Sequence, residues 1–154
     1  MSTGTLNFYG KYHLYLLNDS VELSADTLNV ALLTSAYTPV PNSDGIWTDI
    51  SSNEIAAGNG YSSGGLALAN VTFSLTAGAP PAVFSANNTI WTASGGGSIS
   101  AWRYFVIYSG ATHNGIVKPL IVYGYGDNTP QDVPATPSGK TLNIDWNNGN
   151  IFTA

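Results

Sequence analysis

Hydrophobic and polar residues alternate in several short runs along the chain, with the two-residue period of a β-strand. The clearest run spans residues 27–33 and places Leu28, Val30 and Leu32 on one face. Further strands are predicted at residues 66–75, 82–91, 99–108, 119–125 and 140–145. Turn residues separate these runs, so the sequence predicts an all-β fold, an antiparallel β-sandwich that is jelly-roll-like.

One N-terminal segment departs from this period. In residues 6–17, aromatic side chains recur at spacings of three and four, as in Phe8, Tyr12 and Tyr15, which predicts one short helix. A strand is the alternative reading, because Tyr and Phe favour sheets and Gly10 weakens a helix by about 1 kcal/mol.

The length of the chain fits one core, so residues 1–154 are predicted to form a single β-sandwich domain. Residues 1–20 are its N-terminal helical segment. Residues 37–65 are a long loop region rich in Pro and Gly, with one helical turn predicted at residues 47–50. A loop of this length in a compact domain is either functional or packed against a partner.

The composition of the chain argues against several classes of function. Charged residues make up 8% of the chain, the formal net charge is −5 and there is no Cys. Nucleic-acid binding needs a basic face, so no nucleic-acid partner is expected. No signal peptide and no apolar stretch long enough to cross a membrane is visible, so we expect no membrane partner and synthesis in the cytoplasm.

Candidate chemistry is sparse. His13 is expected to pack within the helix, and His113 to lie at a solvent-facing loop tip. Serine is plentiful enough for a Ser-His-Asp triad, but nothing resembles Gly-x-Ser-x-Gly. The acids that could form a hydrolase dyad or a calcium site are Glu22 with Asp26, Asp49 with Glu54, and Asp127, Asp132 and Asp145. None has a diagnostic spacing, so turn capping is preferred, and no catalytic residue, metal or cofactor is predicted.

Aromatic residues, 12% of the chain, are the remaining candidates for function. Tyr and Trp are enriched in cores and at protein interfaces, and their flat rings can also face sugars. In residues 99–108 both strand faces are largely apolar, as in a strand buried between a sheet and a partner. The candidate residues of an oligomer or shell interface are Trp47, Tyr61, Trp102, Tyr104 and Tyr108. Trp146 shares a face with Leu142 and Ile144 and is predicted to be core.

The order of several segments resembles a known family. The segments are YGK at 9–11, SADTLNVALLTSAYTP at 24–39, WTDISSNE at 47–54, GYSSGG at 60–65, WTAS at 91–94, residues 101–108, PLIVY at 119–123 and LNIDWNNGNIF at 142–152. They are similar to small structural proteins of tailed-bacteriophage virions, of the head decoration or cement type. The resemblance implies a jelly-roll-like sandwich, usually a homotrimer, located on the capsid surface.

The leading hypothesis is therefore a non-enzymatic phage capsid decoration protein that binds the major capsid protein of the assembled head and stabilises the shell. The N-terminal segment or the loop at residues 37–65 would meet the shell, and strand faces near residues 102–108 would be buried in a trimer. The alternative is a phage tail or fibre module that binds host surface glycan through Tyr and Trp. A third reading is a glycosidase or peptidase on the same sandwich.

Overall fold

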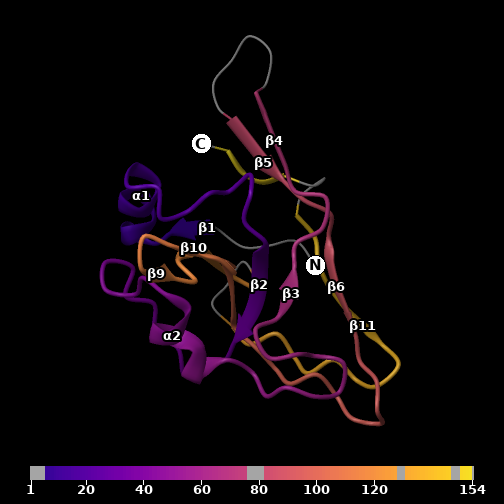
Figure 1. Ribbon diagram of the computed structural model, residues 1–154. Helices are drawn as coiled ribbons and strands as arrows, with labels where there is room; N and C mark the ends of the chain where they lie inside the picture. The colour runs from indigo at the N-terminus through magenta and orange to yellow at the C-terminus, as the bar shows by residue number, and fades with distance from the viewer. Residues whose placement is uncertain (1–5, 76–81, 128–130, 147–149, 154) are drawn as a thin grey trace.

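The computed structural model describes residues 6–75, 82–127, 131–146 and 150–153. Within these ranges the chain forms antiparallel sheets with two short α-helices and one 3-10 turn (Figure 1). The predicted all-β class is confirmed at this level. The jelly-roll arrangement within that class stays a prediction.

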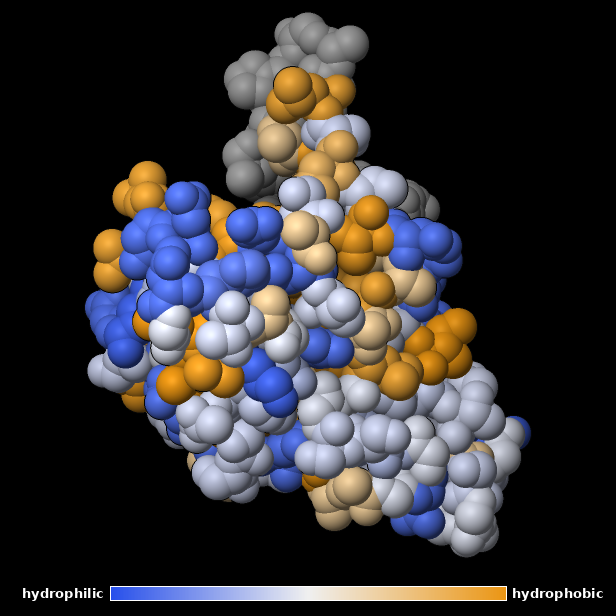
Figure 2. Space-filling view, in the orientation of Figure 1, coloured by the Kyte–Doolittle hydropathy of each residue, from blue (hydrophilic) through white to orange (hydrophobic). Residues whose placement is uncertain are grey.

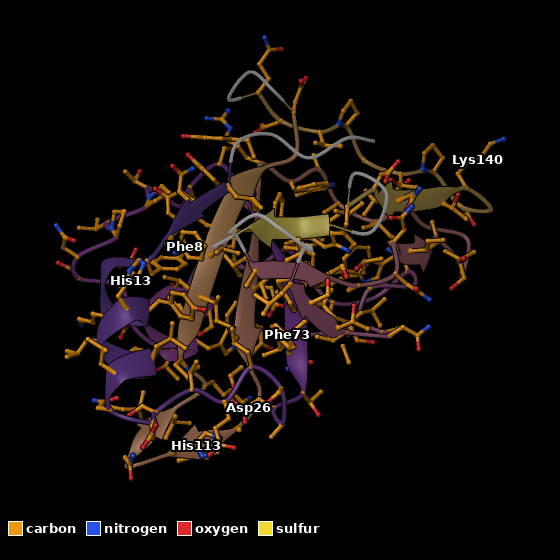
Figure 3. The ribbon with its side chains drawn as sticks, turned by 90° about the horizontal axis from the view of Figure 1, so that it is seen from above. Phe8, His13, Asp26, Phe73, His113 and Lys140 are labelled. Carbon is orange, nitrogen blue, oxygen red and sulfur yellow. The ribbon has the colours of Figure 1, made fainter. Side chains whose placement is uncertain are left out.

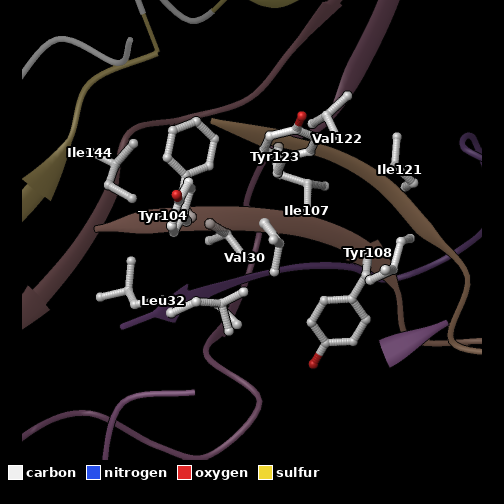
Figure 4. Packing of buried hydrophobic residues seen from close by; sticks show 14 of the residues in the cluster. Val30, Leu32, Tyr104, Ile107, Tyr108, Ile121, Val122, Tyr123 and Ile144 are labelled. Carbon is white, nitrogen blue, oxygen red and sulfur yellow. The ribbon is translucent and has the colours of Figure 1, made fainter. Parts of the chain in front are cut away.

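The central element is a five-stranded antiparallel sheet with the order β1-β10-β7-β2-β3. Its strands are β1 (Leu6–Phe8), β10 (Leu120–Tyr125), β7 (Tyr104–Ser109), β2 (Leu28–Leu33) and β3 (Leu66–Ala67). All six residues of β7 are buried, because β7 lies between β10 and β2 and both of its faces are covered (Figure 4). The predicted strand at residues 27–33 is confirmed as β2.

Three smaller sheets accompany the central sheet within the described residues. One pairs β6 (Thr89–Thr92) with β11 (Thr141–Ile144), and another has the order β12-β5-β4. Its strands are β12 (Asn150–Thr153), β5 (Ala82–Ser85) and β4 (Thr72–Leu75). The short hairpin of β8 (Thr112–His113) and β9 (Ile116–Val117) is the last. The β4 and β5 strands extend beyond the body of the molecule at the top of Figure 1.

Several predicted strands are shorter than expected. Residues 66–75 form β3 and β4 rather than one strand, and Asn70 between them has a positive φ of 52° that a continuous strand does not allow. Residues 82–91 likewise contribute to both β5 and β6. Before β7, Ile99 and Trp102 make only isolated bridges, to Thr136 and Val133.

The helices are α1 (Gly10–Leu17) and α2 (Trp47–Ile50), the latter followed by the 3-10 turn η1 (Ser51–Asn53). The helical turn predicted at residues 47–50 is confirmed. The helix predicted over residues 6–17 is confirmed only from Gly10, because residues 6–8 pair with β10 as the edge of the central sheet. The backbone hydrogen bonds of that edge decide the conformation of these residues against their helical spacing.

Candidate functional site

The five aromatic candidates for an interface are all buried within the chain itself. The exposed fractions are 7% for Trp47, 2% for Tyr61, 1% for Trp102, 7% for Tyr104 and 3% for Tyr108. Trp47, for example, stacks on Tyr108 with ring centroids 4.6 Å apart and 9° between the planes. Contrary to the placement expected from sequence, these side chains leave little surface for a partner, because they fill the chain's own core.

A chain of hydroxyl groups fixes the beginning of the loop at residues 37–65. The Tyr37 hydroxyl donates to Asp44 Oδ2 at 2.7 Å, and the Tyr9 and Tyr37 hydroxyls are 2.8 Å apart. Because Tyr37 gives its proton to the carboxylate, Tyr9 is the donor to Tyr37. Burial, together with the nearby negative charge of Asp44, raises the pKa of the Tyr9 phenol and that of the Tyr37 phenol well above the usual range for tyrosine.

A second network fixes the end of the same loop. The Tyr61 hydroxyl donates to Glu54 Oε1 at 2.8 Å and accepts the Leu32 N–H at 3.0 Å. Glu54 also accepts the Gly64 N–H at 2.6 Å. Between the two networks, Asp49 Oδ2 accepts the backbone N–H groups that precede α2. The long loop therefore packs against its own domain, and its three carboxylates bind loop groups instead of forming a hydrolase dyad.

Asp26 lies at the centre of a polar cluster, although the sequence showed no reason to single it out. Ser109 Oγ donates to Asp26 Oδ2 at 2.6 Å, and His113 Nε2 lies 2.7 Å from Asp26 Oδ1 (Figure 3). His113 lies next to the turn of the β8-β9 hairpin with its side chain 27% exposed, so the expected loop-tip placement is partly right, but the sequence did not reveal its carboxylate partner. This histidine lies in β8 as a partner of a carboxylate whose side chain is only 3% exposed.

The electrostatics of this cluster favour the charged pair. Although burial opposes it, hydrogen bonds from Ser109, His113 and the Glu22 N–H lower the pKa of Asp26. The hydrogen bond to Asp26 raises the pKa of His113. A serine hydrolase needs the imidazole between the hydroxyl and the carboxylate, whereas here the carboxylate lies between the other two groups. This arrangement cannot activate Ser109, and it joins β7, β8 and the segment before β2.

A hollow of about 580 Å³ lies beside this cluster. Its lining includes Asn29, Gly64, Gly65, Tyr108 and Lys118. The Tyr108 hydroxyl already donates to the Gly64 carbonyl, and Asp26 is engaged as above. In the part of the chain that the structure describes, the buried side-chain atoms without a hydrogen-bond partner lie elsewhere. The lining therefore specifies no ligand class.

Two apolar surfaces are open to solvent. The first lies on α1, within the N-terminal segment that was expected to meet the shell, although its leucines were not singled out; the second was not predicted. On α1, Tyr12 and Tyr15 are buried, whereas Leu14 and Leu17 are 58% and 86% exposed. Hydrophobic atoms accordingly lie at the surface over α1 in Figure 2. The signal that could have found this surface is the position of these leucines off the face shared by Tyr12 and Tyr15.

The second apolar surface is β4, where all four residues are exposed. Leu75 is 81% exposed and Phe73 41%, and hydrophobic atoms lie over this projecting part in Figure 2. No charged residue occurs between Glu54 and Arg103, the segment that supplies β3, β4, β5 and β6. This surface is therefore both apolar and free of charge.

Other residues considered from the sequence lie at the surface, in an ion pair or in the core. His13, expected from the sequence to pack, is instead exposed on α1, with its ring 5.6 Å from that of Phe8 (Figure 3). Asp132 pairs with Arg103 at 2.8 Å. Trp146 is fully buried, as predicted. Across the described ranges, no group of three or more His, Asp or Glu could hold a metal ion, and no helix is long and apolar enough to cross a membrane.

Comparison of the chain with known protein families, with curated proteins and with solved structures finds no match.

Proposed function

We propose that the protein is a non-enzymatic phage head decoration protein that attaches to the major capsid protein of the assembled shell through helix α1. The observation that carries the proposal is the pair of leucines, Leu14 and Leu17, that α1 presents to solvent. The buried Tyr12 and Tyr15 hold the helix on the body, so the leucines project from a fixed base.

The size of this contact fits attachment in many copies. Full burial of one leucine side chain contributes about 1.5–3 kcal/mol, so two contribute a few kcal/mol. Association itself costs about 4–15 kcal/mol, so one helix tip cannot hold a lone subunit tightly. An oligomer that engages several shell subunits at once gains avidity without any new type of contact. A homotrimer with the jelly-roll-like sandwich that the family resemblance implies meets this requirement once its subunits are attached to the capsid surface.

The polar cluster supports a structural role over hydrolysis. Asp26 holds both Ser109 and His113, and Glu54 and Asp49 hold the loop at residues 37–65. The few charges of the chain that lie in these networks serve internal contacts. The glycan-binding alternative depends on accessible Tyr and Trp faces on the long loop, and Tyr37, Trp47 and Tyr61 are all buried, the most exposed at 7%. We therefore propose no second function.

The test is a binding assay with purified phage heads that lack this chain. Wild-type protein should sediment with the heads. A double variant, Leu14→Gln with Leu17→Gln, should bind at least tenfold more weakly, because Gln keeps helix propensity while removing the apolar surface. Ile90→Gln is the matched control, since Ile90 is 53% exposed on β6, on the opposite side of the molecule from α1 in Figure 1.

Circular dichroism of all variants should match wild type, because each substituted side chain faces solvent. Wild-type protein that fails to bind the heads would refute the decoration role. Equal binding by wild type and the double variant would instead refute attachment through α1.

A further inference from the structure

Strand β4 forms one edge of the β12-β5-β4 sheet. Within the described residues its only strand partner is β5, with Thr72 opposite Ser85 and Leu75 opposite Ala82. In an antiparallel pair, alternate residues direct their N–H and C=O groups away from the partner strand. The outer side of β4 therefore presents a row of backbone donors and acceptors that matches another extended strand.

The edge lacks the features that usually prevent such pairing. Proteins protect edge strands with Lys and other charges, with Pro, or with bulges. Residues 72–75 contain none of these residues, and the pairing of β4 with β5 is regular along its length. Phe73 stacks on Phe84 with centroids 5.0 Å apart and 14° between the planes. Since Phe84 is buried, this stacking holds β4 against the body as a defined strand.

The absence of charge on this edge favours a second copy of the chain as its partner. The chain carries a net charge of −5, so two copies that meet through faces bearing carboxylates repel each other. The segment between Glu54 and Arg103 has no charge and supplies both β4 and β5. A second copy can therefore approach β4 without like-charge repulsion, whereas a charged partner finds no complementary group on this strand.

From this edge, its exposed apolar side chains and its neutrality, we propose that β4 pairs in the antiparallel direction with β4 of a second copy about a two-fold axis. A strand that pairs with itself in this way makes an isologous, self-complementary interface. Directly opposed residues point to the same face, so Phe73 of one copy lies opposite Phe73 or Leu75 of the other. In either of these registers, the exposed Phe73 and Leu75 side chains of the two copies form one continuous apolar row.

This interface does not depend on attachment to a shell. It also differs from the three-fold arrangement that the family resemblance implies, because a two-fold contact between β4 strands yields a dimer. Its failure is therefore distinguishable from failure of the proposed function.

The test begins with sedimentation velocity of the full chain over a range of concentrations. Wild-type protein should show a monomer–dimer equilibrium. Leu75→Lys should raise the dimer dissociation constant at least tenfold, because it places two like charges at the paired edge. Val117→Lys is the matched control: Val117 is 46% exposed on β9, outside both proposed surfaces, and its substitution should leave the equilibrium unchanged.

A cross-linking variant gives an independent readout. The chain contains no Cys, so Ser74→Cys introduces a single thiol on β4. A short bismaleimide should link the two copies in either register, because the two introduced thiols face each other directly or diagonally, whereas Ser52→Cys, at an exposed position of η1, should cross-link more slowly. Monomeric wild-type protein at all concentrations, equal effects of the two lysine variants, or equal cross-linking of the two cysteine variants would each overturn the proposal.

Discussion

Replacing Tyr37 with Phe tests whether the hydroxyl chain of Tyr9, Tyr37 and Asp44 fixes the long loop. The substitution removes the donor to Asp44 at 2.7 Å and the acceptor for Tyr9 at 2.8 Å. A hydrogen bond to a charged group contributes about 1.5–3 kcal/mol, and a buried hydroxyl left unpaired costs about 1–3 kcal/mol. Asp44 keeps its bond from the Val40 N–H and is partly exposed, so water can replace the lost donor. The expected loss in the free energy of unfolding is about 2–4 kcal/mol.

The decisive result is the effect of Tyr9→Phe in two backgrounds. In the wild type this change removes one neutral hydrogen bond and leaves the bond from Tyr37 to Asp44, so it should cost about 1 kcal/mol. In the Tyr37→Phe background it removes a hydroxyl that is already unpaired and buried, so it should cost nothing or stabilise the protein. The sign of the second substitution therefore depends on the first.

Urea unfolding of the four proteins measures this cycle, with circular dichroism and Trp fluorescence as two probes that must coincide. Tyr12→Phe is the matched control: Tyr12 is buried, but its hydroxyl has no hydrogen-bond partner among the described residues. This control should change the free energy of unfolding by less than about 0.5 kcal/mol. Additive costs of the Tyr9 and Tyr37 substitutions would show that their hydroxyls are not coupled and would refute the network.

Two further predictions concern the backbone and the polar cluster. Because Asp26 has a lowered pKa in the folded protein, its contribution to the free energy of unfolding is present above the ordinary value of 3.8. That contribution is lost as the pH falls through the pKa of the folded state. His113 has a raised pKa, so its contribution is complete below 6.5 and is lost as the pH rises through the folded value. The stability that this pair contributes should therefore be greatest between these two pH values. His113→Gln should remove the decline in unfolding free energy above pH 6.5, as measured by urea titration. An unchanged decline would contradict the pairing of His113 with Asp26. Gly65→Ala should lower the unfolding free energy by at least 2 kcal/mol more than Gly139→Ala, about the cost of forcing a backbone shift. Both glycines have φ near +75°, but only at Gly65 would the new Cβ overlap the Val30 carbonyl oxygen. Equal melting temperatures of the two variants would contradict the predicted difference.

Parts of the fold could be predicted because their signals are local. The alternation in residues 28–33 depends only on neighbouring side chains, and it correctly predicted β2. The turn at residues 47–50 and the burial of Trp146 were also predicted correctly, the latter from its shared parity with Leu142 and Ile144. By contrast, residues 6–8 have helical spacing but form β1, since they pair with a strand more than a hundred positions away in sequence.

The candidate surface could not be predicted in the same way. An aromatic side chain suits a core as well as an interface, so the composition could not decide where Trp102 or Tyr108 would lie. Their burial results from the covering of both faces of β7, which no local pattern records. The exposure of Leu14 and Leu17 likewise depends on which side of α1 meets the body.

The sequence by itself determined the strand-rich class, the shortage of charge and the neutral segment between Glu54 and Arg103, because these are properties of composition and short-range order. The tertiary structure alone decided how the few charges are used. Pairing of β2 with β7 places Leu28 opposite Ser109, which brings Asp26 within hydrogen-bond distance of Ser109 and His113. It also left β4 as an unprotected edge, because the availability of an edge depends on which strands the rest of the chain supplies.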